Sequence, residues 1–131
     1  MKTIMWDKSY SVGIPELDEL HKLLLFQFNR FVQNADKSIH SESFSTFLGD
    51  ITEFSRDHFK KEEMILKKYG FQMPDIEKQK MVHLKFVEEI TEIMMRVLSN
   101  DVTAREDLIE LFHDWFENHI KSDHIAYMNM T

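Results

Sequence analysis

Four stretches of the sequence repeat apolar residues at intervals of three and four, the spacing that places them on one face of an amphipathic helix. Pro15 and Pro74 stand at the start of the first and third stretches, where a helix tolerates proline because its first N–H groups have no helical partner. Gly70 supplies a stop after the second stretch. The pattern predicts four helices, at about 15–35, 41–68, 74–99 and 103–127.

The start of the fourth predicted helix has the spacing of a capping box. The hydroxyl of Thr103 and the carboxylate of Glu106 can each accept a hydrogen bond from the other residue's backbone N–H. Four long helices joined by short polar segments favour an all-α fold, an antiparallel up-down-up-down four-helix bundle. In this prediction the residues before Pro15 form an extended N-terminal arm, and 1–131 is a single domain.

The composition narrows both the fold and the chemistry. Hydrophobic residues make up 43% of the 131, but 3 Gly and 2 Pro are too few for the many tight turns of a β-sandwich or barrel. The absence of Cys excludes disulfides, thiolate metal sites and iron–sulfur clusters. Any metal must therefore be held by His, Asp or Glu.

Charge and hydropathy bear on the partners of the chain. The formal net charge is −7 and no basic run is present, which argues against binding to a phosphate backbone. No apolar stretch is long enough for a secretion signal or a membrane span. We therefore expect a cytoplasmic protein with no nucleic-acid partner and no membrane partner.

Polar residues interrupt the apolar stripe of every predicted helix. His21, His58, His83 and His119 each occupy an inward position on a different helix, and Glu62 follows His58 by one turn. A single inward His is usually a hydrogen-bonded core residue, but four of them with a buried carboxylate need a shared partner. Bundle cores hold dinuclear metal sites built from such residues. Imidazole and carboxylate donors favour iron, manganese or zinc.

The other histidines and the methionines fit simpler interpretations. His40 lies in the polar segment between the first two helices and His113 falls one position past the apolar stripe, so we expect both at the surface. Four methionines are interpreted as packing or C-terminal residues without a functional role: Met94, Met95, Met128 and Met130.

The chain resembles a known family, the bacterial hemerythrins, over nearly its whole length. The resemblance depends on four segments that together are far more specific than a lone His-x-x-x-Glu. They are WDKSYSVGIPELDELH at 6–21, HFKKEE at 58–63, HLKF at 83–86 and WFENHIKSDHIAY at 115–127.

The resemblance implies a four-helix bundle around two non-haem iron ions, bridged by an oxo or hydroxo group, that bind O2 reversibly. In the family one iron takes a His from each of the first two helices and keeps an open position for O2, and His21 and His58 match these. The other iron takes two His from the third helix and one from the fourth, and carboxylates of the second and fourth helices bridge the pair. His83, His119 and Glu62 match their counterparts.

Two positions depart from the family pattern. Gln79 stands where the third helix should carry the first His of a His-x-x-x-His pair. The family places a bridging Asp five residues after the fourth-helix His, and here that position after His119 holds His124, with Asp123 one residue earlier. Tyr127 keeps the family's spacing from His119, which indicates that no residue has been deleted.

Three interpretations of these departures remain open. In the first, Gln79 is a poor ligand and the second iron is lost or weak. In the second, which we favour, His124 supplies the imidazole lost at position 79, so that five His and one bridging Glu remain. In the third, Asp123 still bridges through an adjusted helix end while Gln79 offers its amide oxygen or a hydrogen bond.

The function expected from the resemblance is binding of O2, or another small diatomic ligand, by a carrier, store or sensor. The alternatives are a di-iron reductase or peroxidase that acts on NO, peroxide or O2, and a bundle with a vestigial metal site. A sensor would need another protein for its output, and the sequence identifies neither a signalling partner nor an electron donor. Four apolar residues should exclude water from the site: Leu24, Phe28, Phe54 and Ile90.

Overall fold

The structure is a computed structural model that describes residues 3–120, apart from the side chains of Asp75 and His119. A single 3₁₀ turn, η1 (Lys8–Tyr10), precedes the first long helix. Long helices and a final π-helical segment make up the remaining elements, and no strand occurs within 3–120. They are α1 (Pro15–Gln33), α2 (Glu42–Lys68), α3 (Met73–Leu98), α4 (Ala104–Asp114) and η2 (Trp115–Ile120).

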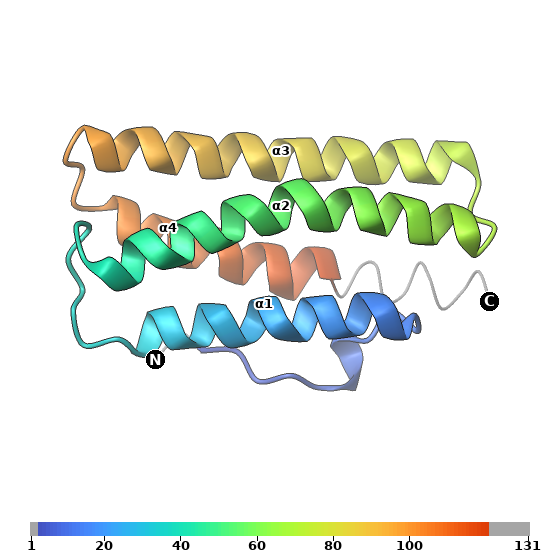
Figure 1. Ribbon diagram of the computed structural model, residues 1–131, viewed down its shortest axis with the longest axis horizontal. Helices are drawn as coiled ribbons and strands as arrows, with labels where there is room; N and C mark the ends of the chain where they lie inside the picture. Colours follow the sequence, from blue (N-terminus) through green and yellow to red (C-terminus); the bar gives the residue numbers. More distant parts are fainter. Residues whose placement is uncertain (1–2, 121–131) are drawn as a thin grey trace.

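The four helices lie side by side along the long axis of the molecule (Figure 1). Their backbones approach one another most closely between α1 and α2, between α2 and α3, and between α3 and α4. The colours of Figure 1 run in opposite directions in consecutive helices, and short segments connect the ends. None of the described helices is long and apolar enough to cross a membrane.

The predicted helix bounds agree with the first three helices to within two residues and differ for the fourth. There the α-helix ends at Asp114, and the chain continues in the wider π-helical turn η2 to Ile120, beyond which it lies outside the described residues. A π turn takes one residue more per turn, so it changes the register at which side chains face the interior. Alternation of apolar and polar residues does not reveal such a change.

The capping prediction for α4 is wrong. Thr103 has helical backbone angles (φ −82°, ψ −9°) and its side chain caps nothing. The carboxylate of Asp101 instead accepts hydrogen bonds from the Thr103 N–H (3.0 Å) and hydroxyl (2.6 Å), while Glu106 accepts one from the Arg105 guanidinium. Arg96 holds the Thr103 hydroxyl from the other side, so this hydroxyl is not available to the helix N-terminus.

The interior contains two separate groups of buried apolar side chains. The larger group fills most of the bundle and is rich in stacked aromatic rings, such as Phe28 on Phe112 at 4.1 Å and Phe31 on Phe47 at 4.8 Å between centroids. The smaller group lies where the α2–α3 turn meets the start of α1. It consists of Val12, Ile14, Leu17, Leu66, Phe71 and Ile76.

A layer of polar side chains separates the two apolar groups. On α1, Leu17 belongs to the smaller group and Leu24 to the larger, and His21 lies between them. The same order occurs on α2 and α3, where polar residues lie between members of the two groups. We call this set the polar layer, and its members are His21, His58, Glu62 and His83.

Candidate metal centre

Three helices bring the polar layer together. Their apolar stripes face the interior, so His21 on α1, His58 and Glu62 on α2, and His83 on α3 are turned inward with them. Each of these four residues is at most 3% exposed. The inward positions predicted for these four residues are therefore confirmed.

The polar atoms of the layer lie at distances suited to a shared ion. The Glu62 Oε2 atom is 3.1 Å from His58 Nε2 and 3.4 Å from His83 Nε2. The rings of His21 and His58 have centroids 5.0 Å apart, and donor atoms of His21, His58 and Glu62 all lie within 4.8 Å of one another. Donors on one first-row metal ion sit about 2 Å from it and thus about 3 to 4 Å apart. The donor set fits a transition-metal ion.

The carboxylate of Glu62 is ionised at neutral pH. Burial by itself would raise its pKa. The hydrogen bond with His58 and the electrostatic influence of His58, His83 and His21 outweigh burial and lower the pKa of Glu62 from 4.5 to about 2. An ionised carboxylate among imidazoles is the form that binds iron, manganese or zinc.

Comparison with known proteins identifies the family. The hemerythrin HHE cation-binding domain matches residues 12–125. The chain belongs to the hemerythrin family. Hemerythrin-like proteins of Naegleria gruberi and Naegleria fowleri are each 30% identical over 122 residues, which is 93% of this chain and 88% of either relative. The family resemblance seen in the sequence is thereby confirmed.

The two departures from the hemerythrin pattern fall in different parts of the structure. Gln79 lies on α3 one turn before His83, and its Oε1 atom is buried although the side chain as a whole is half-buried. The backbone of His119 forms part of η2, but the structure does not describe its side chain. His124 and Asp123 also lie outside the described residues. Their predicted roles stay predictions.

Aromatic rings stack on two histidines of the polar layer. Phe54 lies parallel to His58 at 4.2 Å between centroids, and Phe59 lies parallel to His83 at 3.8 Å. Stacking restricts the rotation of each imidazole, and the rings keep water away from the layer. The role of Phe59 was not predicted from the sequence. No local pattern could have identified it, because the His83 ring on which it stacks lies on another helix.

The remaining histidines and methionines lie away from the polar layer. His40 is exposed as predicted, and its ring bonds to the Asn100 side chain at 2.9 Å, while His113 is half-buried. The packing interpretation is wrong for Met95, which is 64% exposed, whereas Met94 is 39% exposed and its Sδ atom accepts a contact from the Thr52 hydroxyl of α2 at 3.7 Å. Met128 and Met130 lie outside the described residues.

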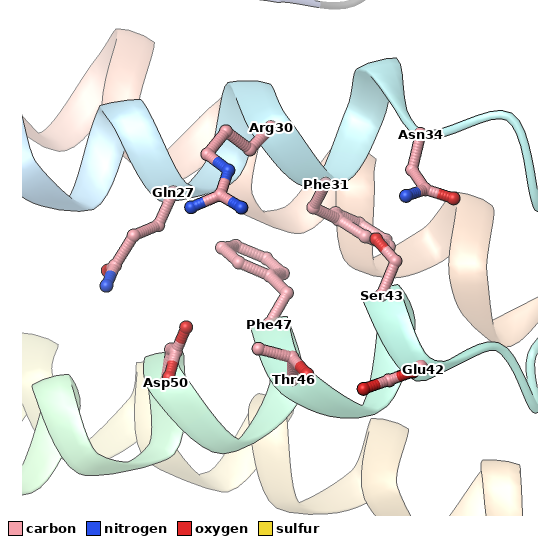
Figure 2. Close-up of a pocket in the computed structure, with 9 residues that line it drawn as sticks. All are labelled: Gln27, Arg30, Phe31, Asn34, Glu42, Ser43, Thr46, Phe47 and Asp50. Atoms are coloured by element: carbon pink, nitrogen blue, oxygen red, sulfur yellow. The ribbon is translucent and has the colours of Figure 1, made fainter.

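A groove on the described surface lies apart from the candidate centre. It has a volume of about 300 Å³ and lies between the end of α1 and the start of α2. Figure 2 shows Arg30 and Asp50 facing each other across it, with the ring of Phe47 between the helices. None of the polar-layer residues lines this groove, so it is separate from the candidate metal centre.

Proposed function

We propose that this hemerythrin-family protein holds two iron ions in its polar layer and binds O2 reversibly, as a carrier, store or sensor. One observation carries the proposal. Three imidazoles and an ionised carboxylate from α1, α2 and α3 converge in a buried layer between two apolar groups. Such a cluster of buried polar groups would cost several kcal/mol without a shared partner.

The arrangement supports a division of the donors between two ions. His21 and His58 would hold one iron, and His83 would hold the other together with His119. Glu62 would join the two, because its Oε2 atom lies near both His58 and His83. Ferrous ions held there would supply reversible binding of O2. The chain's apolar groups and the stacked Phe54 and Phe59 rings would exclude water and protons from the centre.

The proposal extends to the connectivity of the bundle and the fourth helix. We propose that consecutive helices run in opposite directions, so that residues of the fourth helix approach the polar layer beside α1. Among the interpretations of the departures we favour compensation, in which His124 replaces the imidazole that Gln79 cannot supply. The burial of the Gln79 Oε1 atom is compatible with the third interpretation, in which Asp123 bridges and Gln79 offers its amide oxygen or a hydrogen bond.

The iron content after anaerobic ferrous reconstitution and desalting tests the proposal. We expect two irons per chain and reversible binding of O2 in stoichiometric amounts. His58→Ala should lose iron, whereas His40→Ala removes an exposed imidazole and should keep both ions. One iron per chain or none in the wild-type protein would overturn the di-iron proposal.

The same measurement separates the interpretations of the fourth helix. Under compensation, His124→Ala loses an iron and Asp123→Ala retains both. The reverse result would favour a bridging Asp123. If neither substitution changes the iron content, neither residue is a ligand that the centre needs.

An enzymatic role is the second candidate, and the altered donor set favours it. An imidazole at position 124, in place of the family's bridging carboxylate, would raise the net positive charge of the centre relative to the family pattern, whereas the exchange of an imidazole for an amide at position 79 leaves the charge unchanged. This change shifts redox potential and ligand preference. Rapid consumption of NO or peroxide in the presence of an electron donor would indicate a reductase or peroxidase. Slow consumption with stoichiometric O2 binding would indicate a carrier, store or sensor.

A further inference from the structure

The segment before α1 is anchored to that helix at two places. Near its start, the Asn29 side chain accepts a hydrogen bond from the Ile4 N–H (2.9 Å) and donates one to the Ile4 carbonyl (2.8 Å). Near its end, the Asp18 carboxylate accepts hydrogen bonds from the Ser11 hydroxyl (2.6 Å) and the Val12 N–H (2.9 Å). Figure 1 shows the segment running beside α1 between these anchors.

Between its anchors the segment contacts the π-helical turn η2. The Tyr10 ring lies 4.9 Å from the Phe116 ring, and the Trp6 ring packs edge-on against Phe116 at 6.4 Å. The buried Tyr10 hydroxyl donates a hydrogen bond to Glu117 Oε1, a residue 107 positions away in the sequence. The segment therefore connects α1 directly to the end of the fourth helix.

This connection joins α1 to the fourth helix, and these two helices are not among the pairs whose backbones approach closely. Extensive backbone approaches link α1 to α2, α2 to α3 and α3 to α4, whereas α1 meets α4 through side chains such as the stacked Phe28 and Phe112. A π turn is also a rare and weakly stabilised conformation that depends on its surroundings. The contacts of Trp6 and Tyr10 are thus well placed to keep η2 in register.

The turn that Tyr10 holds is the one whose backbone carries His119, two residues after Glu117. We propose that Tyr10 is a positioning residue, which acts through Glu117 to hold His119 in place for the metal centre. This inference rests on the proposed function, because it takes His119 as a ligand. The segment before α1 would then control how firmly the fourth helix binds the ion, although the first proposed ligand in the sequence is His21.

Three substitutions test the contact, and the chain offers a matched control. Tyr10→Phe removes the hydroxyl and keeps the ring. Glu117→Gln keeps an oxygen that accepts the same hydrogen bond and should behave like the wild type. Tyr69→Phe is the control, because the Tyr69 hydroxyl donates a similar bond to Glu16 (3.1 Å) at the exposed α1–α2 surface, away from η2.

The first measurement uses the metal-free protein. Amide hydrogen exchange over residues 115–120, followed by mass spectrometry, reports how firmly the turn is held. We expect exchange about tenfold faster in Tyr10→Phe, the change that loss of one buried hydrogen bond produces. Tyr69→Phe and Glu117→Gln should leave it unchanged. Equal exchange in Tyr10→Phe and the wild type would overturn the inference.

The second measurement uses the iron-loaded protein under anaerobic conditions, with the rate of iron loss to a strong ferrous chelator as the readout. We expect Tyr10→Phe to speed the loss about tenfold, as the removal of an outer supporting residue commonly does. Glu117→Gln should keep the wild-type rate, and Tyr69→Phe should also leave it unchanged. In a His119→Ala background, Tyr10→Phe should add nothing.

The outcomes separate this inference from the proposed function. A wild-type protein that takes up no iron overturns the proposed function and the role of Tyr10 in it. Normal iron uptake, with the same rate of loss in Tyr10→Phe and Tyr69→Phe, overturns the positioning role alone. An equal effect of Tyr10→Phe with and without His119 also overturns it, because Tyr10 would then act on the bundle in general.

Discussion

Glu62 is the residue on which the electrostatics of the interior depend. A carboxylate in an apolar core would normally take up a proton, because burial penalises its charged form. Here three imidazoles surround it, and they hold its pKa at about 2 in spite of that burial. The interior of the metal-free protein therefore offers an ionised carboxylate to a cation. This preparation is a property of side chains from α1, α2 and α3 acting together.

Replacement of Glu62 should give a pH-dependent loss of stability in the metal-free protein. The folded-state pKa lies below the ordinary value of 4.5, so the stabilisation is fully present above pH 4.5 and is lost as the pH falls toward 2. We expect Glu62→Gln to lower the free energy of unfolding by about 2 kcal/mol at near-neutral pH. In urea unfolding, this difference should shrink progressively below pH 4.5.

The neighbouring substitution Glu63→Gln serves as the control, because Glu63 is only half-buried and lies outside the polar layer. It should change the unfolding free energy by a few tenths of a kcal/mol, as surface substitutions do. A Glu62→Gln protein as stable as the wild type at all pH values would contradict the assignment of Glu62 as a charged member of the layer.

At the scale of elements, the α3–α4 turn shows how polar side chains fix a helix start. Asn100 adopts a left-handed conformation (φ 60°), which ends α3. Arg96 then binds Asp101 at 2.8 Å and Asp107 at 2.6 Å, so one guanidinium joins the end of α3 to the first turn of α4. The hydrogen bonds from Thr103 and the Arg96 contact lower the pKa of Asp101 to about 2. This network sets the direction in which α4 leaves the turn.

Removal of the Asp101 carboxylate should destabilise the turn. Asp101→Ala leaves the Thr103 N–H without its acceptor and Arg96 without one of its two anions. We expect the melting temperature to fall by several degrees, because the turn loses several hydrogen bonds at once. Because the folded-state pKa of Asp101 is lowered from 3.8, this effect is present above pH 3.8 and disappears as the pH falls toward 2.

Thermal unfolding followed by circular dichroism measures the change. Glu53→Ala, at an exposed site on α2, is a suitable comparison and should shift the melting temperature little. Equal melting temperatures for Asp101→Ala and Glu53→Ala would show that the turn does not depend on Asp101.

At the scale of the whole molecule, the polar layer divides the core into two apolar groups that do not merge. A continuous apolar core would be the more stable solution for a bundle that binds nothing, because buried polar groups contribute less than well-packed apolar ones. The division is thus a cost to the metal-free fold that a bound cation offsets. Stability and metal occupancy should be coupled in this protein.

Iron removal should therefore lower stability markedly. A ligand at a hundredfold excess over its dissociation constant stabilises the folded state by about 2.7 kcal/mol. We expect the iron-loaded protein to melt several degrees above the metal-free protein in anaerobic calorimetry. His58→Ala should show no such increase on addition of ferrous iron. Equal melting temperatures for the loaded and metal-free wild-type protein would indicate a vestigial site.

Local sequence patterns predicted a large part of the fold and of the candidate site. The bounds of α1, α2 and α3 follow from the three-and-four spacing of apolar residues, with Pro15, Pro74 and Gly70 near the ends. The inward positions of His21 and His83 follow from the same spacing. These features are predictable because the geometry of a helix relates neighbouring residues directly.

Other features depended on contacts between residues far apart in the chain. The Tyr10 hydroxyl meets Glu117 across 107 positions, and the Glu62 carboxylate meets His83 of another helix. The predicted Thr103 cap is absent because Asp101 and Arg96, the latter from the preceding helix, both bind the Thr103 hydroxyl. No local pattern encodes such pairs.

The sequence by itself therefore determined the helices, their inward faces and the family to which the chain belongs. Only the tertiary structure decided that four side chains form one layer between two apolar groups, and that the fourth helix continues as a π turn held by Tyr10. The physical reason is a difference in range. Helix periodicity is a property of consecutive residues, whereas the meeting of donor atoms and the register of η2 depend on how whole helices pack.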